Sequence, residues 1–358
     1  MTRARELANL AGVSETPLSN RSLVINGAMQ VHQRGNQSVS SGNSYSLDRW
    51  EVATVGGSAA YDLQQSTDVP TGQGFANSFK IDVTTADTAM GAGDGYFFRQ
   101  AFEGQNLQSI KKGTSNAEQV TVQFWVKSTK TGTYILELYD TDNTRQVSKS
   151  YTVSSADTWE YKTVTFPADT SGAMDNDNAR SLLLQWWLAA GSDFTSGTLN
   201  TTWASATSAN RVVGQVNALD NASNNFHVVG VQMELGEQAT PFEHRSYGEE
   251  LTICKRYFHA YGGGVDEYPV TGVWTGSEAI FPFTFAEMRA APTVTSSAAN
   301  TFKAVREAVA WSTGTSVSVS TITKQAYSMV LTASSDTRGY ASRLHITTSA
   351  YIHADAEL

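Results

Sequence analysis

Aromatic side chains in polar surroundings are the groups in this chain whose chemistry is easiest to name. A flat ring can pack against the C–H face of a sugar ring, while polar side chains at its rim form hydrogen bonds with the hydroxyls. Six residues fit this description as ligand-binding candidates: Trp125, Trp187, Tyr268, Trp274, Trp311 and Tyr340.

The spacing of neighbouring residues separates these candidates from ordinary core aromatics. In Gln119–Lys127 the apolar side chains alternate with polar ones, so Trp125 falls on the polar face of a predicted strand. Trp186 and Trp187 are adjacent on a strand and must face opposite sides, which puts one in the core and leaves Trp187 for the surface. Trp274 and Trp311 stand in loop-like, Thr- and Gly-rich contexts, so we expect their substitution by Ala to weaken ligand binding more than it lowers the melting temperature.

Residue patterns for catalysis or metal binding are missing from the sequence. No G-x-S-x-G motif occurs, and the six histidines never form an H-x-H or H-x-x-x-H pair. The single cysteine, Cys254, is expected to pack as a small apolar residue on a helix. The acidic turns 140–143 and 169–178 lack the spacing of an EF-hand and are predicted to be solvated turns. We therefore expect no catalytic residue, no metal and no cofactor, and a protein that is not an enzyme.

Length and charge exclude several other classes of function. A chain of 358 residues is expected to hold two domains. Its net charge of −9, without a long basic cluster, argues against nucleic-acid binding. No run of 18 apolar residues predicts a membrane span, and the start of the chain lacks the apolar core of a secretory signal. We expect synthesis in a cytoplasm.

Short, evenly spaced β patterns separated by turn clusters indicate an antiparallel sandwich between residues 21 and 245. The expected strands are residues 23–25, 78–83, 95–102, 119–127, 133–139, 146–153, 159–166, 181–188 and 225–235. A small amphipathic helix is expected within residues 1–20.

The remainder of the chain predicts a helix followed by a second β region. Ser246 and Glu249 form a capping box, which favours a helix over 246–261 in a connector that extends to 262. Residues 263–358 are predicted to form a β-rich tip, with strands at 279–285, 315–322, 328–332 and 343–348. As a single chain, so polar a region would bury only a small hydrophobic core. Assembly of three chains would bury the additional apolar surface. The side chains expected to be buried between subunits are Phe302, Val305, Val309 and Trp311.

Two segments resemble the terminal strands of jelly-roll carbohydrate-binding modules. These are the run from Leu23 through Asn26-Gly27 to Gln30, and the run Val228–Glu234. The resemblance implies a calcium ion between the terminal strands. However, Gln30 and Gln232 stand where the family has carboxylates, and calcium prefers anionic oxygens.

A second resemblance is to bacteriophage tail fibre and related virion proteins. It is carried by the run Val231–Glu243 and its continuation Glu249–Phe258, by Met288–Val294, and by the opening Met1–Asn9. The resemblance implies a homotrimeric fibre in the virion, with residues 1–20 attached to a tail or portal-proximal virion protein. It also implies a C-terminal tip that binds a host surface glycan or an outer-membrane protein.

The sequence therefore predicts a mainly β protein: an attachment segment (1–20), a jelly-roll sandwich (21–245), a connecting helix (246–262) and a receptor-binding tip (263–358). The function expected is that of a tail fibre that adsorbs to the host cell. Two alternatives stay open, namely a fibre or decoration protein on the capsid and a depolymerase of cell-surface polysaccharide.

Overall fold

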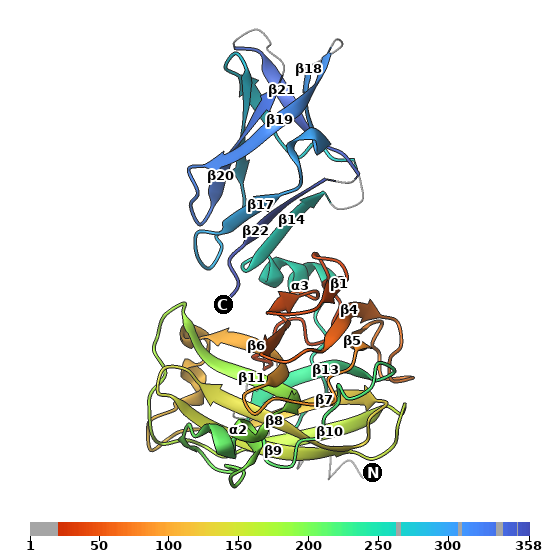
Figure 1. Cartoon of the computed structure of the whole chain (residues 1–358). Helices are drawn as coiled ribbons and strands as arrows, with labels where there is room; N and C mark the ends of the chain where they lie inside the picture. Colours follow the sequence, from red (N-terminus) through yellow and green to blue (C-terminus); the bar gives the residue numbers. More distant parts are fainter. Residues whose placement is uncertain (1–20, 263–265, 307–309, 334–338, 349) are drawn as a thin grey trace. The chain divides into compact units, whose positions relative to one another are not determined.

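The computed structural model describes residues 21–262, 266–306, 310–333, 339–348 and 350–358. The predicted attachment segment, residues 1–20, lies outside the described residues. The chain divides into two compact units, with unit 1 ending at Glu250 and unit 2 covering Leu251–Glu357 (Figure 1). Within the described part of the chain, no helix has the length and apolar character needed to cross a membrane.

Unit 1 is an antiparallel β-sandwich, as the sequence predicted. One sheet has the strand order β1-β4-β5-β13-β7-β10. Its strands are β1 (Gln37–Val39), β4 (Ala60–Ser66), β5 (Ser78–Thr85), β13 (Asn225–Leu235), β7 (Val120–Ser128) and β10 (Glu160–Phe166). The other sheet has the order β12-β9-β8-β11-β6-β3-β2. Its strands are β12 (Ala204–Ser205), β9 (Arg145–Val153), β8 (Gly132–Asp140), β11 (Arg180–Ala190), β6 (Gly95–Glu103), β3 (Glu51–Val55) and β2 (Ser44–Tyr45).

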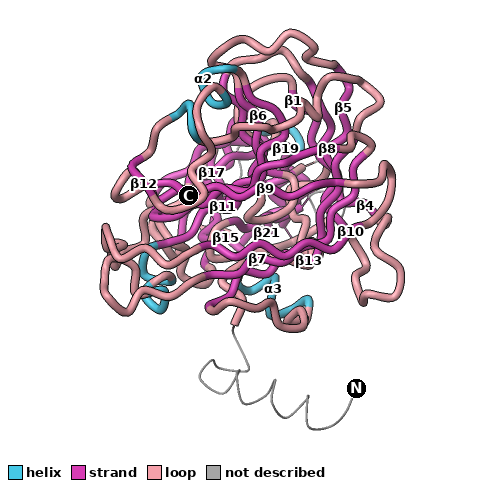
Figure 2. The backbone as a smooth tube through the Cα atoms, turned by 90° about the horizontal axis from the view of Figure 1, so that it is seen from below, coloured by secondary structure: helices cyan, strands magenta, loops and turns pink. Residues whose placement is uncertain are grey.

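In the part of the chain that the structure describes, the helical elements are short, and strands dominate the view of Figure 2. They are α2 (Ser192–Thr195), α3 (Tyr247–Cys254) and the 3-10 turns η1 (Gly104–Asn106), η2 (Gln108–Ile110), η3 (Ser208–Asn210) and η4 (Ala299–Thr301). In α3 the predicted capping box is present: the Glu249 carboxylate accepts hydrogen bonds from the Ser246 backbone N–H (3.0 Å) and hydroxyl (2.7 Å). The helix is shorter than predicted and ends at Cys254, because residues 258–262 pair as strand β14 instead of continuing it.

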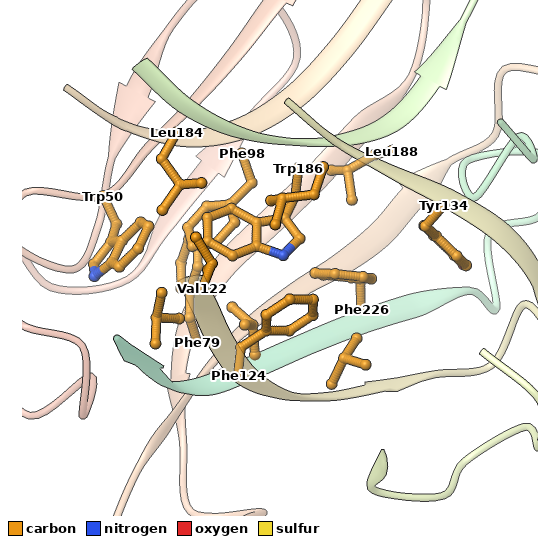
Figure 3. Close-up of a cluster of buried hydrophobic side chains, with 14 of the residues drawn as sticks. Trp50, Phe79, Phe98, Val122, Phe124, Tyr134, Leu184, Trp186, Leu188 and Phe226 are labelled. Carbon is orange, nitrogen blue, oxygen red and sulfur yellow. The ribbon is translucent and has the colours of Figure 1, made fainter. Parts of the chain in front are cut away.

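The core of unit 1 lies between its two sheets. Figure 3 shows Trp186 of β11 pointing toward Phe124 of β7, with the ring centroids 5.3 Å apart in an edge-to-face pair. Trp50 stacks on Phe98 at 4.7 Å and meets Trp186 edge-on at 5.8 Å. All four rings are completely or almost completely buried, and burial of so much aromatic surface is the main force that holds the sheets together.

The outer face of the seven-stranded sheet is covered around Trp187, and this corrects the expectation for that residue. Its ring packs against Phe97 and Phe194 and is 1% exposed. The Trp187 indole donates a hydrogen bond to Glu137 (2.9 Å), whose carboxylate also binds the Arg211 guanidinium through two bonds of 2.8 Å. The segment after β11 folds back over this face, so alternation alone could not show that both sides of β11 are buried.

The predicted acidic turns are solvated at Asp142, Asp175 and Asp177, but Asp140 and Asp169 belong to a buried ion-pair network. Lys112 extends its ammonium to Asp140 (2.5 Å) and Asp169 (3.0 Å), and the three side chains are 4% exposed or less. Arg145 binds the Asp169 carboxylate through two hydrogen bonds of 2.7 and 2.9 Å. Burial by itself raises the pKa of Asp169, but the hydrogen bonds from Arg145 and Lys112 outweigh burial and lower it. The cations that Asp140 and Asp169 bind are therefore the Lys112 ammonium and the Arg145 guanidinium.

Unit 2 contains a closed barrel and a small sheet. The barrel order is β15-β16-β20-β19-β18-β21, and the three-stranded sheet has the order β14-β22-β17. The barrel strands are β15 (Thr271–Trp274), β16 (Glu278–Thr284), β20 (Ala326–Ala333), β19 (Ala310–Ser320), β18 (Phe302–Arg306) and β21 (Ala341–Ile346). The sheet strands are β14 (Phe258–Gly262), β22 (Tyr351–Asp355) and β17 (Thr293–Ser296).

Closing the barrel gives unit 2 a core of its own. Trp274, Phe281, Phe302 and Tyr327 are 1% exposed or less in a single chain. Phe302 and Val305, expected to be buried between subunits, are already buried here, and the side chains of Val309 and Trp311 are outside the described residues. The polar composition is explained by the outer barrel surface, where Ser316, Ser318 and Ser320 of β19 are exposed.

Candidate functional site

A groove of about 700 Å³ lies on the outer face of the six-stranded sheet in unit 1. The lining residues come from β7, β10 and β13 and from two loops: Gln73, Phe75, Gln123, Trp125, Tyr161, Gly230, Ala239, Thr240, Pro241, Phe242 and His244. They are mainly aromatic, amide and hydroxyl side chains.

The floor of the groove is a cross-strand aromatic pair. Trp125 of β7 lies directly opposite Tyr161 of β10, and the two ring centroids are 5.4 Å apart. The inward neighbours Phe124 and Val126 are fully buried, which forces Trp125 outward by the two-residue period of a strand. Trp125 is half-buried and Tyr161 is 47% exposed, so this pair offers ring surface to a ligand.

Gln123 stands two residues before Trp125 on the same face of β7. Its side chain is 3% exposed, and its Oε1 accepts a short hydrogen bond from the Tyr161 hydroxyl. Among the residues that the structure describes, its Nε2 has no hydrogen-bond partner. A buried donor without a partner costs about 1–3 kcal/mol, and proteins usually retain such groups for a reason.

Three rings form the opposite wall. Phe75, Phe242 and His244 lie with centroids 4.8–5.2 Å apart. Gly230 makes room for them at a bulge in β13: its φ is +68°, and a Cβ there would lie 2.6 Å from the Phe75 ring. Only glycine satisfies both the left-handed backbone and the close contact.

Residues 241–245 form a strip, here called the wall strip, whose side chains alternate between two tasks. Phe242 and His244 line the groove, while Glu243 and Arg245 bind the first described residues. The Glu243 carboxylate accepts the backbone N–H groups of residues 21 and 22 at 2.9 and 3.1 Å. The Arg245 guanidinium donates to the carbonyls of Ser22 (2.9 Å) and Val24 (3.2 Å).

Charged side chains near the groove occur as pairs. Lys127, two residues after Trp125, forms a short ion pair with Asp68, and the Trp159 indole donates to the same carboxylate (2.9 Å). Burial alone would raise the pKa of Asp68, but the bonds from Lys127 and Trp159 outweigh burial and lower it. Lys80, on the same face of the sheet, is paired with Asp82 (2.7 Å), whereas the Lys162–Glu160 pair (2.6 Å) lies on the other side of β10, opposite the inward Phe124 and Val126.

The structure separates the six predicted site residues. Of the five whose side chains are described, Trp125 alone lines the groove, while Trp187 and Trp274 are 1% exposed and belong to cores. Burial of Trp274 inside the barrel corrects the expectation that its loop-like sequence context exposes it. The backbone of Trp311 lies in β19, and its side chain is outside the described residues.

Tyr268 and Tyr340 are exposed in unit 2, at 44% and 50%. Tyr268 stacks on His345 at 4.8 Å, and the Arg343 guanidinium lies 5.1 Å from the Tyr268 centroid.

Sequence reasoning missed Gln123, Tyr161, Phe75, Phe242 and His244 as groove residues. The alternation in Glu160–Phe166 could have placed Tyr161 on the outer face, since Val164 and Phe166 are inward. Pairing β10 with β7 would then have joined it to Trp125. Nothing in the sequence places Phe75 and Phe242, which lie in loops 167 residues apart, side by side.

Comparisons with known proteins give weak likenesses to solved structures. No known protein family matches the sequence, and no curated protein matches it. The enzymatically active domain of tailspike protein 4 of bacteriophage CBA120 is 14% identical, over 60% of this chain and 21% of that chain, with a TM-score of 0.33. This chain thus matches about a fifth of the tailspike domain's length.

Two other similar structures are described by their names as sugar-binding proteins. A family 4 carbohydrate-binding module is 10% identical over 59% of this chain and 98% of that chain, with a TM-score of 0.30. A putative sugar binding protein from Bacteroides thetaiotaomicron VPI-5482 is 11% identical over 60% of this chain and all of that chain, with a TM-score of 0.35. Likeness at this level does not assign a function to this chain.

Proposed function

We propose that this protein binds a glycan in the groove of unit 1, with a sugar ring against Trp125 and Tyr161. The observation that carries the proposal is the Trp125–Tyr161 pair beside the unpartnered Nε2 of Gln123. Half-exposed rings supply the apolar surface that the C–H face of a sugar needs, and amides and hydroxyls supply the rim. A groove of about 700 Å³ is in the range of small-ligand sites and could hold a few sugar units.

We also propose that the protein is a fibre of a bacteriophage virion that adsorbs to a host surface glycan. The support is the resemblance of the junction Val231–Phe258 and of the start of the chain to phage fibre proteins. In this proposal the chain is a homotrimer, and residues 1–20 attach it to another virion protein. In this proposal the adsorption site lies in the sandwich and not in the C-terminal unit expected from the sequence. The reason is that Trp125 lines a groove, whereas Trp274 is buried.

Single substitutions distinguish the two units as binding sites. Trp125→Ala and Tyr161→Ala are expected to lower the affinity for host cells or their isolated glycans at least tenfold, about 1.4 kcal/mol. Tyr340→Ala is the matched control, since it removes a similarly exposed ring from unit 2. If Tyr340→Ala abolishes adsorption while Trp125→Ala leaves it unchanged, the groove is not the receptor site.

The depolymerase alternative is tested on the same glycans. We propose binding without cleavage, because the groove presents rings, amides and hydroxyls, whereas glycoside hydrolysis uses a pair of carboxyl groups. The assay measures reducing ends and solution viscosity over hours with purified protein. Release of new reducing ends that Trp125→Ala abolishes would replace the binding proposal by an enzyme.

The homotrimer is tested by light scattering of the purified chain. A mass of three times 38.7 kDa is the expected result. A monomer over a wide range of concentration would refute the trimeric fibre and leave the groove proposal intact.

A further inference from the structure

We infer that the groove selects neutral glycans and that Gln123 supplies a hydrogen-bond donor that recognises them. This inference rests on the proposed function, since it specifies the ligand of the same groove. It is drawn from the charges around the groove and from the hydrogen bonds of one buried amide.

The charge pattern favours a ligand without carboxylates or sulfates. Among the described residues that line the groove, none is Lys, Arg, Asp or Glu. On the same face of the sheet, the ammonium groups of Lys127 and Lys80 are engaged by Asp68 and Asp82. An acidic glycan would lose hydration in the groove without gaining a cationic partner, and the net charge of −9 would oppose its approach.

The hydrogen bonds of Gln123 determine which of its atoms is left for a ligand. The Tyr161 hydroxyl donates to Oε1, which fixes the amide orientation and leaves the two N–H groups of Nε2 without an acceptor in the described part of the chain. Gln123 lines the groove from the floor, next to the aromatic pair. A hydroxyl or ring oxygen that reaches this floor accepts from Nε2 and removes the cost of the unpaired donor.

Tyr161 therefore has two roles in this proposal. Its ring pairs with Trp125 as part of the stacking surface, and its hydroxyl positions the amide of Gln123. Tyr161→Phe keeps the ring and releases the amide. This variant isolates the positioning role from the stacking role.

The test uses soluble polysaccharides as probes: mixed-linkage β-glucan, xylan and galactomannan as neutral polymers, and alginate and polygalacturonate as acidic ones. Affinity electrophoresis and calorimetry measure binding by wild type, Trp125→Ala, Gln123→Leu and Tyr161→Phe. Gln119→Leu is the matched control, because Gln119 lies on the same face just before β7 and bonds to Glu237 outside the groove. Melting temperatures confirm that each variant is folded.

We expect at least one neutral polymer to bind, with no binding of the acidic ones. Gln123→Leu should weaken that binding about tenfold, Tyr161→Phe by a smaller factor and Gln119→Leu not at all, in line with the loss of one hydrogen bond. Binding of an acidic polymer that Trp125→Ala abolishes would refute the selectivity while leaving glycan binding in place. Wild-type affinity in Gln123→Leu would refute the role of the amide. If no polymer of either class binds in a Trp125-dependent way, the proposed function itself fails.

Discussion

Protonation of His227 is expected to destabilise unit 1 in mild acid. The imidazole is 3% exposed on β13, its Nδ1 lies 3.4 Å from the Ser78 hydroxyl, and its ring meets Trp159 edge-on. Burial lowers its pKa from 6.5 to about 4. Among the neighbouring charges, Lys127 and Lys80 add to this lowering, while Asp68 and Asp82 oppose it.

The sign and size follow from the two protonation states. The folded unit holds a neutral imidazole, whereas the unfolded chain takes up a proton at the ordinary pKa, so acid favours the unfolded state. The contribution is complete above pH 6.5 and is lost as the pH falls toward 4. At about 1.4 kcal/mol per pKa unit, the whole loss is about 3 kcal/mol, of which about 2.5 kcal/mol is lost by pH 4.5.

The assay is urea unfolding of wild type and His227→Gln at pH 7 and at pH 4.5, followed by tryptophan fluorescence. Glutamine is neutral at both values and can bond to Ser78, so the variant should lose about 2.5 kcal/mol less than wild type. His259→Gln is the control: burial lowers the pKa of His259 to about 4 as well, but in unit 2. Equal losses in wild type and His227→Gln, or an NMR titration of His227 near pH 6.5, would refute the reasoning.

Three further substitutions test other parts of the structure. Lys112→Met leaves two buried aspartates without their ammonium and should lower the free energy of unfolding by about 3 kcal/mol, measured in urea; an unchanged value would show that the network contributes no stability. Gly230→Ala should lower the melting temperature and the glycan affinity together, because its Cβ would overlap Phe75, whereas Gly214→Ala at a similarly positive φ with open space should leave the affinity unchanged. Trp274→Ala should destabilise unit 2 by about 3–5 kcal/mol and leave binding to the groove intact, so a loss of affinity without a loss of stability would contradict its place in the core.

Predictions from the sequence were most accurate where a local residue pattern determines the bounds of an element or its buried face. The alternation in Gln119–Lys127 correctly put Val120, Val122 and Phe124 inside and Trp125 outside. The capping box correctly predicted the start of α3, because a cap depends on residues three apart. The expected strand over 225–235 coincides with β13.

Prediction failed where distant segments determine burial. Trp187 alternates outward correctly, but a later loop covers it with Phe194 and Arg211. Trp274 is followed by Thr and Gly, which suggested a loop, and the barrel that buries it requires pairing with β21, about 70 residues away. One side of the groove is formed by strands and the other by the packing of loops. Only the strand side, which carries Trp125, could be predicted from the sequence.

The wall strip gives the groove a mechanical connection to the beginning of the described chain. Tension on the chain ahead of Arg21 would load the bonds that Glu243 and Arg245 form with residues 21–24, and their neighbours Phe242 and His244 line the groove. Tension on the N-terminal side and a ligand in the groove would therefore act on the same five residues, 241–245. We expect the force that ruptures this clamp in single-molecule pulling to change when the groove is filled, and an unchanged force would show that the two sides of the strip move independently.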